Sequence, residues 1–95
     1  MAQCSLRLYV AGHTTRSAYA VANLYRISQN GGSGPWDIAV IDVLEHPQVA
    51  RDERVLATPT LVKVSPLPTR RVVGDFSDTG EVLARLDLGP DHSKG

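Results

Sequence analysis

Residues 56–64 read LATPTLVKV and place a proline between two threonines at the start of an apolar run. The β-rich residues 60–64 predict a strand. Proline cannot donate a hydrogen bond to a β ladder, so it belongs at a strand's first residue, at an edge or at a bulge. We therefore expect a strand that begins directly after Pro59.

The first half of the chain predicts a strand, a helix and a second strand. Leu6, Leu8 and Val10 alternate with Arg7 and Tyr9, which is the period of a strand. Apolar residues recur at helical spacing over 17–29, and the glycine-rich stretch NGGSGP then ends that helix. The dense apolar run 36–43 is typical of a buried strand. This half therefore predicts a right-handed crossover unit.

The second half predicts a short helix, a hairpin and a final helix. Residues 47–56 favour a helix with Pro47 in its first turn. Residues 70–74 predict a fourth strand, close enough to 60–64 for a hairpin. Ser77 or Asp78 is expected to cap a helix over 78–87, with three residues on one face: Val82, Leu83 and Leu86. The fold class is α/β with the order β-α-β-α-β-β-α, in one domain over 1–95, ordered over 6–88 with a loose tail at 89–95.

Composition narrows the function classes. Ten basic and ten acidic side chains cancel, so the net charge does not point to nucleic acid or a membrane surface. No apolar stretch approaches the roughly 18 residues of a spanning helix, and the first residues lack the pattern of a signal peptide. One cysteine excludes an internal disulfide and a C-x-x-C pair. We expect a cytoplasmic location.

The titratable side chains form no recognisable catalytic or metal-binding pattern. The three histidines are scattered along the chain: His13, His46 and His92. Asp42 and Glu45 follow a predicted strand, where a carboxylate can act as a base, but a capping or surface role is favoured. Cys4 has only Arg7 as a nearby cation, which predicts an inert thiol. We expect no cofactor and no metal, and an enzyme is disfavoured.

A strand, a loop, a long helix and a Thr-Pro-Thr ahead of a hairpin resemble the plan of thioredoxin-like domains. This resemblance implies a cis Thr58-Pro59 bond that faces the turn in which such domains carry their redox cysteines. Here the turn reads HTTRS, with Thr14 and Ser17 at the positions of the thiols. The resemblance thus implies a redox scaffold without its redox chemistry. A residual oxidoreductase that uses Cys4 is the least favoured alternative.

The chain more specifically resembles the KaiB family of small clock proteins. The matching stretches are LRLYVAGHT, VIDVLEHPQVARDERVLATPTLVKV, PLPTRRVVGDFSD and VLARLDL, nearly from Leu6 to Leu88. The resemblance implies a non-enzymatic adaptor that binds a KaiC-type ATPase, with a KaiA-like protein or a sensor kinase as further partner. The alternative is a stand-alone thioredoxin-like interaction domain with a different partner in stress response or signalling.

The expected partner-binding residues are basic or aromatic, types that are enriched in protein interfaces. They are Arg7, Tyr19, Arg54, Lys63, Arg70 and Arg71. Tyr19 lies off the apolar stripe of the first helix, whereas Tyr25 lies on it and is expected in the core. Family members usually have several Lys or Arg at positions where this chain has Tyr19, Ala22, Tyr25 and Ala39.

The family resemblance also implies two folds for one sequence: a tetramer with a rearranged second half and a thioredoxin-like monomer. The positions expected to influence this balance are Pro59, Pro66, Pro68, Gly80, Arg85 and Asp87. Slow X-Pro isomerisation is one candidate gate, and an ordinary rigid SPLP connection is the other interpretation. Relatives often have glycine where this chain has Arg85, which favours the helix by about 0.8–1 kcal/mol, while Gly80 opposes it weakly. We expect the thioredoxin-like monomer, with a tetramer in the alternative fold.

Overall fold

The computed structural model describes residues 4–30, 36–74 and 76–87. Their elements follow the predicted β-α-β-α-β-β-α order: β1 (Cys4–Val10), α1 (Thr15–Asn30), β2 (Trp36–Asp42), α2 (Pro47–Asp52), β3 (Thr60–Ser65), β4 (Arg70–Val73) and α3 (Thr79–Arg85). The expected tail 89–95 and His92 lie outside the described residues. No helix in the described ranges is both long and apolar enough to cross a membrane.

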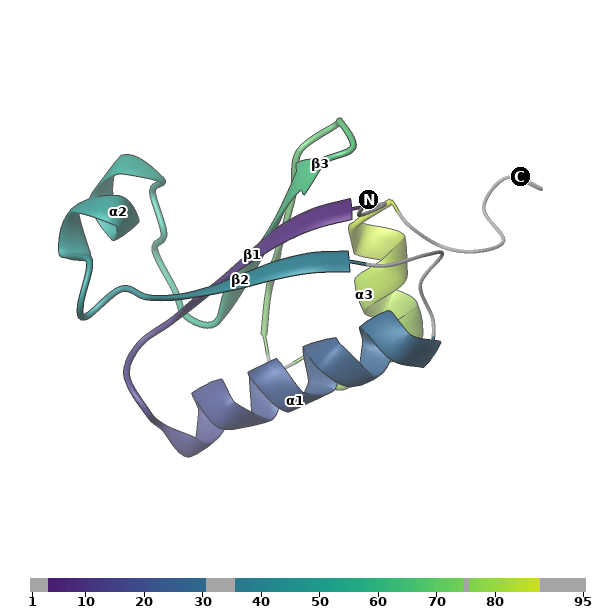
Figure 1. The fold of residues 1–95 in the computed structure, drawn as a ribbon, viewed down its shortest axis with the longest axis horizontal. Helices are drawn as coiled ribbons and strands as arrows, with labels where there is room; N and C mark the ends of the chain where they lie inside the picture. The colour runs from purple at the N-terminus through teal and green to yellow at the C-terminus, as the bar shows by residue number, and fades with distance from the viewer. Residues whose placement is uncertain (1–3, 31–35, 75, 88–95) are drawn as a thin grey trace.

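The strands form one sheet in the order β2-β1-β3-β4 (Figure 1). β1 and β2 are parallel and are connected through α1, whereas β3 is antiparallel to both β1 and β4. The predicted β3–β4 hairpin is confirmed. β1 and β3 are therefore central strands, and β2 and β4 form the two edges.

The core lies between one face of the sheet and the helices α1 and α3. Leu6, Leu8 and Leu61 point from β1 and β3 into this layer and are almost completely buried. The helices contribute Ala20, Leu24, Ile27, Val82, Leu83 and Leu86 to the same cluster. Full burial of one aliphatic side chain is worth roughly 1.5–3 kcal/mol, so this layer is the main source of stability. The predicted apolar face of α3 is confirmed.

The buried stripe of α1 does not include Tyr25, which was predicted to lie on it. Ser17, Ala20, Leu24 and Ile27 recur at intervals of three and four and face the sheet. Tyr25 follows Leu24 by one residue, a turn of about 100° around the helix axis, and is 44 % exposed. The prediction of Tyr25 as a core residue is therefore wrong.

β2 is an edge strand and not the buried strand that its composition predicts. Val40 is 45 % exposed, and Ala39 is also exposed. α2 contributes no buried residue, and Figure 1 shows it beyond the end of the sheet, at the left of the view. Because an apolar run of this length fits either a central or an edge strand, composition alone could not distinguish them.

Local hydrogen bonds explain where the helices begin and end. The carboxylate of Asp78 accepts from the Glu81 amide at 3.1 Å and caps α3, as predicted. Pro47 opens α2, as predicted, but α2 ends at Asp52 and Arg54 has a φ of 56°. α3 is also shorter than the predicted 78–87, because Leu86 and Asp87 form a turn after Arg85.

The entrance to β3 has the predicted cis Thr58-Pro59 bond. The Pro59 side chain is fully buried, and its carbonyl accepts from the Gly74 amide at 3.2 Å. The Thr60 hydroxyl donates to the carbonyl of Ala57. Ser65-Pro66 and Leu67-Pro68 in the β3–β4 connection are also cis. Pro59 therefore stands directly ahead of a strand, as the ladder argument requires.

Candidate functional site

Two hydroxyl groups occupy the β1–α1 turn. Thr14 Oγ1 accepts from the Ser17 amide at 3.0 Å, which is an N-terminal cap for α1. The same hydroxyl donates to Ser17 Oγ at 3.0 Å, and Ser17 is 6 % exposed. We call Thr14 and Ser17 the hydroxyl pair. It holds the turn together, and neither oxygen can exchange a disulfide.

The ends of β1 and β2 are joined through one carboxylate. Asp42 Oδ1 accepts from the Gly12 amide at 3.0 Å and from the Leu44 amide at 2.9 Å. The hydrogen bond from Gly12 lowers the pKa of Asp42 most, and the one from Leu44 lowers it further. The neighbouring His13 and His46 act in the same direction. Asp42 thus stabilises the loops that follow β1 and β2.

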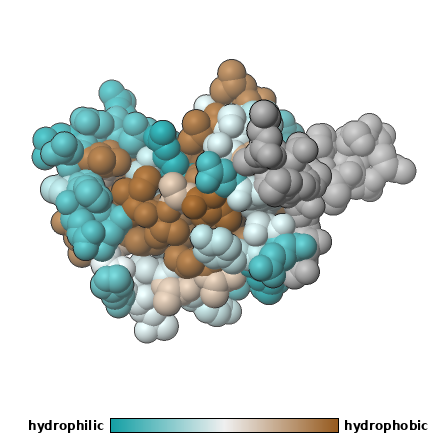
Figure 2. All heavy atoms as spheres, viewed as in Figure 1, coloured by the Kyte–Doolittle hydropathy of each residue, from teal (hydrophilic) through white to brown (hydrophobic). Residues whose placement is uncertain are grey.

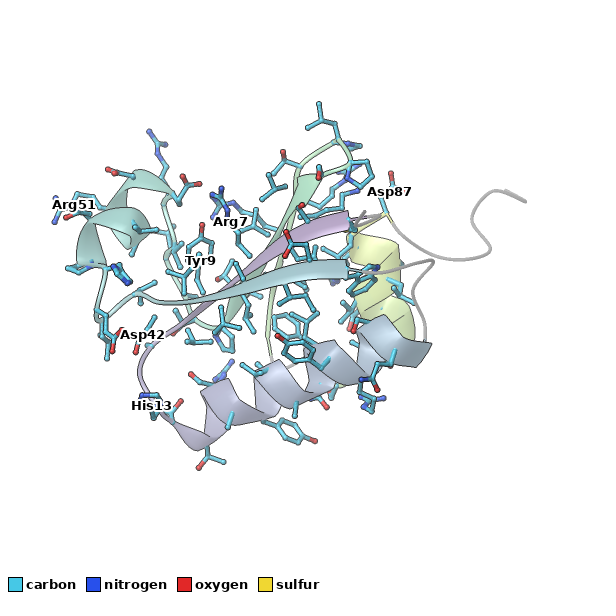
Figure 3. All side chains as sticks on the ribbon, viewed as in Figure 1. Arg7, Tyr9, His13, Asp42, Arg51 and Asp87 are labelled. Carbon is cyan, nitrogen blue, oxygen red and sulfur yellow. The ribbon has the colours of Figure 1, made fainter. Side chains whose placement is uncertain are left out.

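A cavity of about 360 Å³ opens between the start of α1 and the end of β2. We call it the strand-end cavity. Val10, Val21 and Val40 contribute apolar side chains to its lining, and Asp42 contributes a carboxylate. Figure 3 shows Asp42 at the end of β2 and His13 in the loop after β1, on the same side of the molecule. The cavity lies at the carboxyl ends of two parallel strands, where ligands bind in many α/β proteins.

Two histidines that are far apart in sequence meet at this cavity. His13 and His46 line it together with Asp42 and Glu45. The described residues nevertheless contain no group of three His, Cys, Asp or Glu that could hold a metal ion. His13 follows β1 and His46 follows β2, and the parallel pairing of these two strands places both histidines at the same end of the sheet.

Two of the predicted partner-binding residues, Arg7 and Arg71, lie on the sheet face opposite α1, and the backbone of a third, Arg54, contacts Arg71. Arg7 and Arg71 flank Val62 in the register of β1, β3 and β4, and both are exposed. Arg71 donates to the carbonyl of Glu53 and, at 3.3 Å, to the carbonyl of Arg54. We call Arg7, Arg54 and Arg71 the arginine cluster. The salt bridge found among the described residues joins Arg85 to Glu81, so no acidic side chain there neutralises this cluster.

The other predicted partner-binding residues do not join the arginine cluster. Lys63 is 1 % exposed, because strand alternation puts it on the core face with Leu61, and it is not an accessible contact in this fold. Tyr19 is 53 % exposed, as expected, but lies on α1 in the opposite layer. Arg70 is exposed at the start of β4, where it pairs with Lys63.

Cys4 is the first residue of β1 and is buried in the core. Burial raises the pKa of the Cys4 thiol, and the charge of Lys63 opposes this in part. The neighbouring cation is therefore Lys63, and not Arg7 as the sequence suggested. A thiol with a raised pKa and no exposure fits the predicted inert role.

Solved structures with similar folds are thioredoxins and their relatives. Mitochondrial thioredoxin 3 of Saccharomyces cerevisiae matches with a TM-score of 0.69 at 16% identity, over 92% of this chain and 79% of that one. The N-terminal domain of Synechococcus elongatus SasA matches with a TM-score of 0.74 at 25% identity, over 90% and 81%. The chain is a thioredoxin-like α/β protein, as predicted.

Sequence comparison identifies the family within this fold. The KaiB domain model matches residues 7–88. The circadian clock protein KaiB3 of Synechocystis sp. is 46% identical over 86 residues, which cover 90% of this chain and 84% of that protein. The circadian clock oscillator protein KaiB of Synechococcus elongatus is 51% identical over 83 residues, 87% and 81% of the two chains. The chain belongs to the KaiB family.

Proposed function

We propose that this KaiB-family chain is a non-enzymatic, cytoplasmic adaptor that binds a KaiC-type ATPase ring in circadian or clock-like regulation. The observation that carries the proposal is the identity of 46% and 51% to two circadian clock proteins over most of the chain. The hydroxyl pair supports a binding role over a redox role, because a turn without sulfur has no disulfide to transfer.

The arginine cluster is the proposed contact for an acidic surface of the partner. Its three guanidinium groups are exposed and have no acidic partner among the described residues. Arg71 is held in place by two carbonyl groups, which limits the side-chain entropy that binding would otherwise remove. Arginine also binds carboxylates through two parallel hydrogen bonds. Arg70 and Tyr19 remain proposed contacts at separate positions.

Size-exclusion chromatography with a KaiC-type ATPase and nucleotide tests this function. We expect the two proteins to co-elute at tens of micromolar, and Arg7→Gln to weaken binding most at low ionic strength. Arg16→Gln is the matched control, because Arg16 is an exposed arginine on α1, outside the arginine cluster. Absence of co-elution for the unmodified chain at these concentrations would refute the proposal.

A second candidate is a stand-alone interaction domain for a different partner in stress response or signalling. Three uncharged residues that are exposed on α1 favour it: Tyr19, Ala22 and Tyr25. In KaiB proteins the corresponding helix usually has several basic residues. A genome with a kinase gene beside this one and no KaiC-type gene would favour this candidate over the first.

We also propose that the free chain is mainly a thioredoxin-like monomer. Arg85 forms a salt bridge with Glu81 at 3.0 Å within α3, at the i,i+4 spacing that supports a helix. Arg85→Gly removes this pair and should destabilise α3 by about 0.8–1 kcal/mol, whereas Gly80→Ala changes helix propensity in the opposite direction. NMR secondary shifts over 79–85 measure the helical population, and extended shifts in the unmodified chain would contradict the proposal.

The proline and C-terminal positions assigned to fold switching remain proposals. Pro59, Pro66 and Pro68 follow cis bonds, and Asp87 has a φ of 62° after the end of α3. A tetramer in an alternative fold, and a KaiA-like or sensor-kinase partner, belong to the same proposal. Sedimentation of the unmodified and Arg85→Gly chains would measure any tetramer directly.

A further inference from the structure

The strand-end cavity has no role in the function proposed above. It is formed by the first turn of α1, the end of β2 and the connection to α2. Its volume of about 360 Å³ is within the range of small-molecule sites, and such sites combine apolar walls with a few polar groups. Val10, Val21 and Val40 supply the wall, and Asp42 and Glu45 supply the carboxylates.

The acidic groups of this cavity are available to a ligand. Both hydrogen bonds that Asp42 accepts from described residues go to Oδ1, so Oδ2 is left without a partner within that part of the chain. Asp42 and Glu45 also form no salt bridge with a described residue. The two amide hydrogen bonds fix the carboxylate of Asp42 in place, so a ligand would not have to order it.

We propose that the strand-end cavity binds an organic cation with a slender apolar body, an alkylguanidinium or alkylammonium group that donates to Asp42 Oδ2. The apolar part packs on the three valines, and Glu45 adds a second negative charge at the opening. A charge-assisted hydrogen bond to a carboxylate is about twice as strong as a neutral one. The proposed function does not require this site.

The alternatives to a cation fit the cavity less well. An anion would face two carboxylates. The Ser17 amide at the α1 N-terminus, where anions usually bind, already donates to Thr14 Oγ1. A metal ion lacks three suitable ligands among the described residues.

NMR titration of the full chain with n-butylguanidinium chloride tests the proposal. The reporters are the amides of Gly12 and Leu44, because both bond to Asp42. We expect saturable shifts at these amides with a millimolar dissociation constant, as suits a ligand of this size. n-Butylurea, which is neutral and of similar shape, should bind at least tenfold more weakly.

Variants separate the charge from the shape of the cavity. Asp42→Asn keeps an oxygen that can accept from Gly12 and Leu44 but removes the negative charge, and should weaken binding at least tenfold. Ala18→Leu adds volume inside the cavity and leaves Asp42 in place. Its matched control is Ala22→Leu, on the same helix one turn later and exposed outside the cavity. Ala18→Leu should abolish the saturable shifts and Ala22→Leu should not.

Some outcomes would overturn the proposal. The first is that butylurea binds as tightly as butylguanidinium. The second is that the shifts do not saturate, or that they appear equally at the amides beside Asp78 and Glu81. The third is that Ala18→Leu binds the cation as tightly as the unmodified chain. No ATPase is present in these titrations, so they fail or succeed independently of the proposed function.

A second arm identifies the source of the cation. An N-acetylated and C-amidated Gly-Arg-Gly peptide is compared with the same peptide containing citrulline. If the arginine peptide shifts Gly12 and Leu44 and the citrulline peptide does not, the natural ligand is a protein side chain. If only butylguanidinium binds, the natural ligand is a free small cation. Failure of both cations refutes the site.

Discussion

β1 and β2 are neighbouring parallel strands of seven residues, and both are rich in aliphatic side chains. Nevertheless Leu8 of β1 is fully buried, while Val40, its direct partner in β2, is 45 % exposed. The difference comes from their neighbours: β1 has a strand on each side and two helices over its core face, whereas β2 has one strand. Burial in this molecule is thus set by the position of a strand in the sheet.

The exposed side chains of β2 form part of an apolar area on the molecular surface. Figure 2 shows apolar side chains over β2 in the middle of this face, beside the hydrophilic region of α2 at the left. Val40 and Leu44 are among the exposed large apolar residues. An edge strand with an apolar surface can pair with other chains, so β2 is open to new contacts along its free edge.

The largest expected effect tests the contrast between β1 and β2 directly. Leu8→Ala should lower the free energy of unfolding by about 2–5 kcal/mol, because it leaves a cavity beneath two helices. Val40→Ala, at the paired position, should cost less than about 1 kcal/mol, the full span of strand propensities. Urea unfolding followed by circular dichroism measures both. Equal losses would contradict the contrast.

A smaller effect concerns the turn that follows β1. Gly12 has a φ of 71°, and a Cβ at this position would lie 3.1 Å from Leu44 Cδ1. Gly12→Ala should therefore destabilise the fold by about 1–2 kcal/mol, the cost of a left-handed conformation. Gly80→Ala is the control: its Cβ would lie 3.7 Å from Asp78 Oδ1, and the change should be neutral or stabilising. A neutral Gly12→Ala would mean that the turn relaxes freely.

The smallest expected effect concerns the end of β2 and depends on pH. The amides of Gly12 and Leu44 lower the pKa of Asp42 in the folded state. The ionised carboxylate therefore stabilises the fold above its pKa in the unfolded chain, about 3.9. This stabilisation is lost as the pH falls through the pKa of Asp42 in the folded state. Asp42→Asn cannot titrate, so its deficit relative to the unmodified chain should shrink below about pH 4. Solvent at this half-exposed carboxylate keeps the effect small.

Urea midpoints at pH 7, 4 and 3 would measure this convergence. Glu45→Gln is the matched control, because Glu45 is an exposed carboxylate at the same cavity that accepts no hydrogen bond from the described residues. A deficit of Asp42→Asn that stays constant across these pH values would show that the hydrogen bonds, and not the charge, carry the role of Asp42.

The order of the elements could be predicted from local signals. Pro59 ahead of a β-rich run, Asp78 as a cap and the 3.6-residue spacing of α3 each act over a few residues, and each prediction is confirmed. The edge position of β2, the burial of Lys63 and the exposure of Tyr25 depend on which surfaces meet after folding. Residue types alone do not encode those contacts, so these three predictions failed.

The residues of the candidate sites could be predicted from residue type, but their arrangement depends on tertiary contacts. Arg7 and Arg71 were expected as contacts from residue type alone, and the register of three strands places them on one face. The meeting of His13, His46 and Asp42 follows from the parallel pairing of β1 and β2. The predicted crossover unit implied that pairing, but it did not indicate which loop residues would lie side by side. His13 lies about thirty residues from Asp42 and His46 in the sequence, so no local motif contains all three.

The hydroxyl pair has a consequence for how such a molecule is controlled inside a cell. Two alcohols at the head of α1 hold the turn by a bond that forms and breaks without electron transfer. Swings in the glutathione pool, which would open or close a dithiol in this place, leave the turn unaltered. Oxidation or reduction therefore cannot switch this turn, because it contains no sulfur.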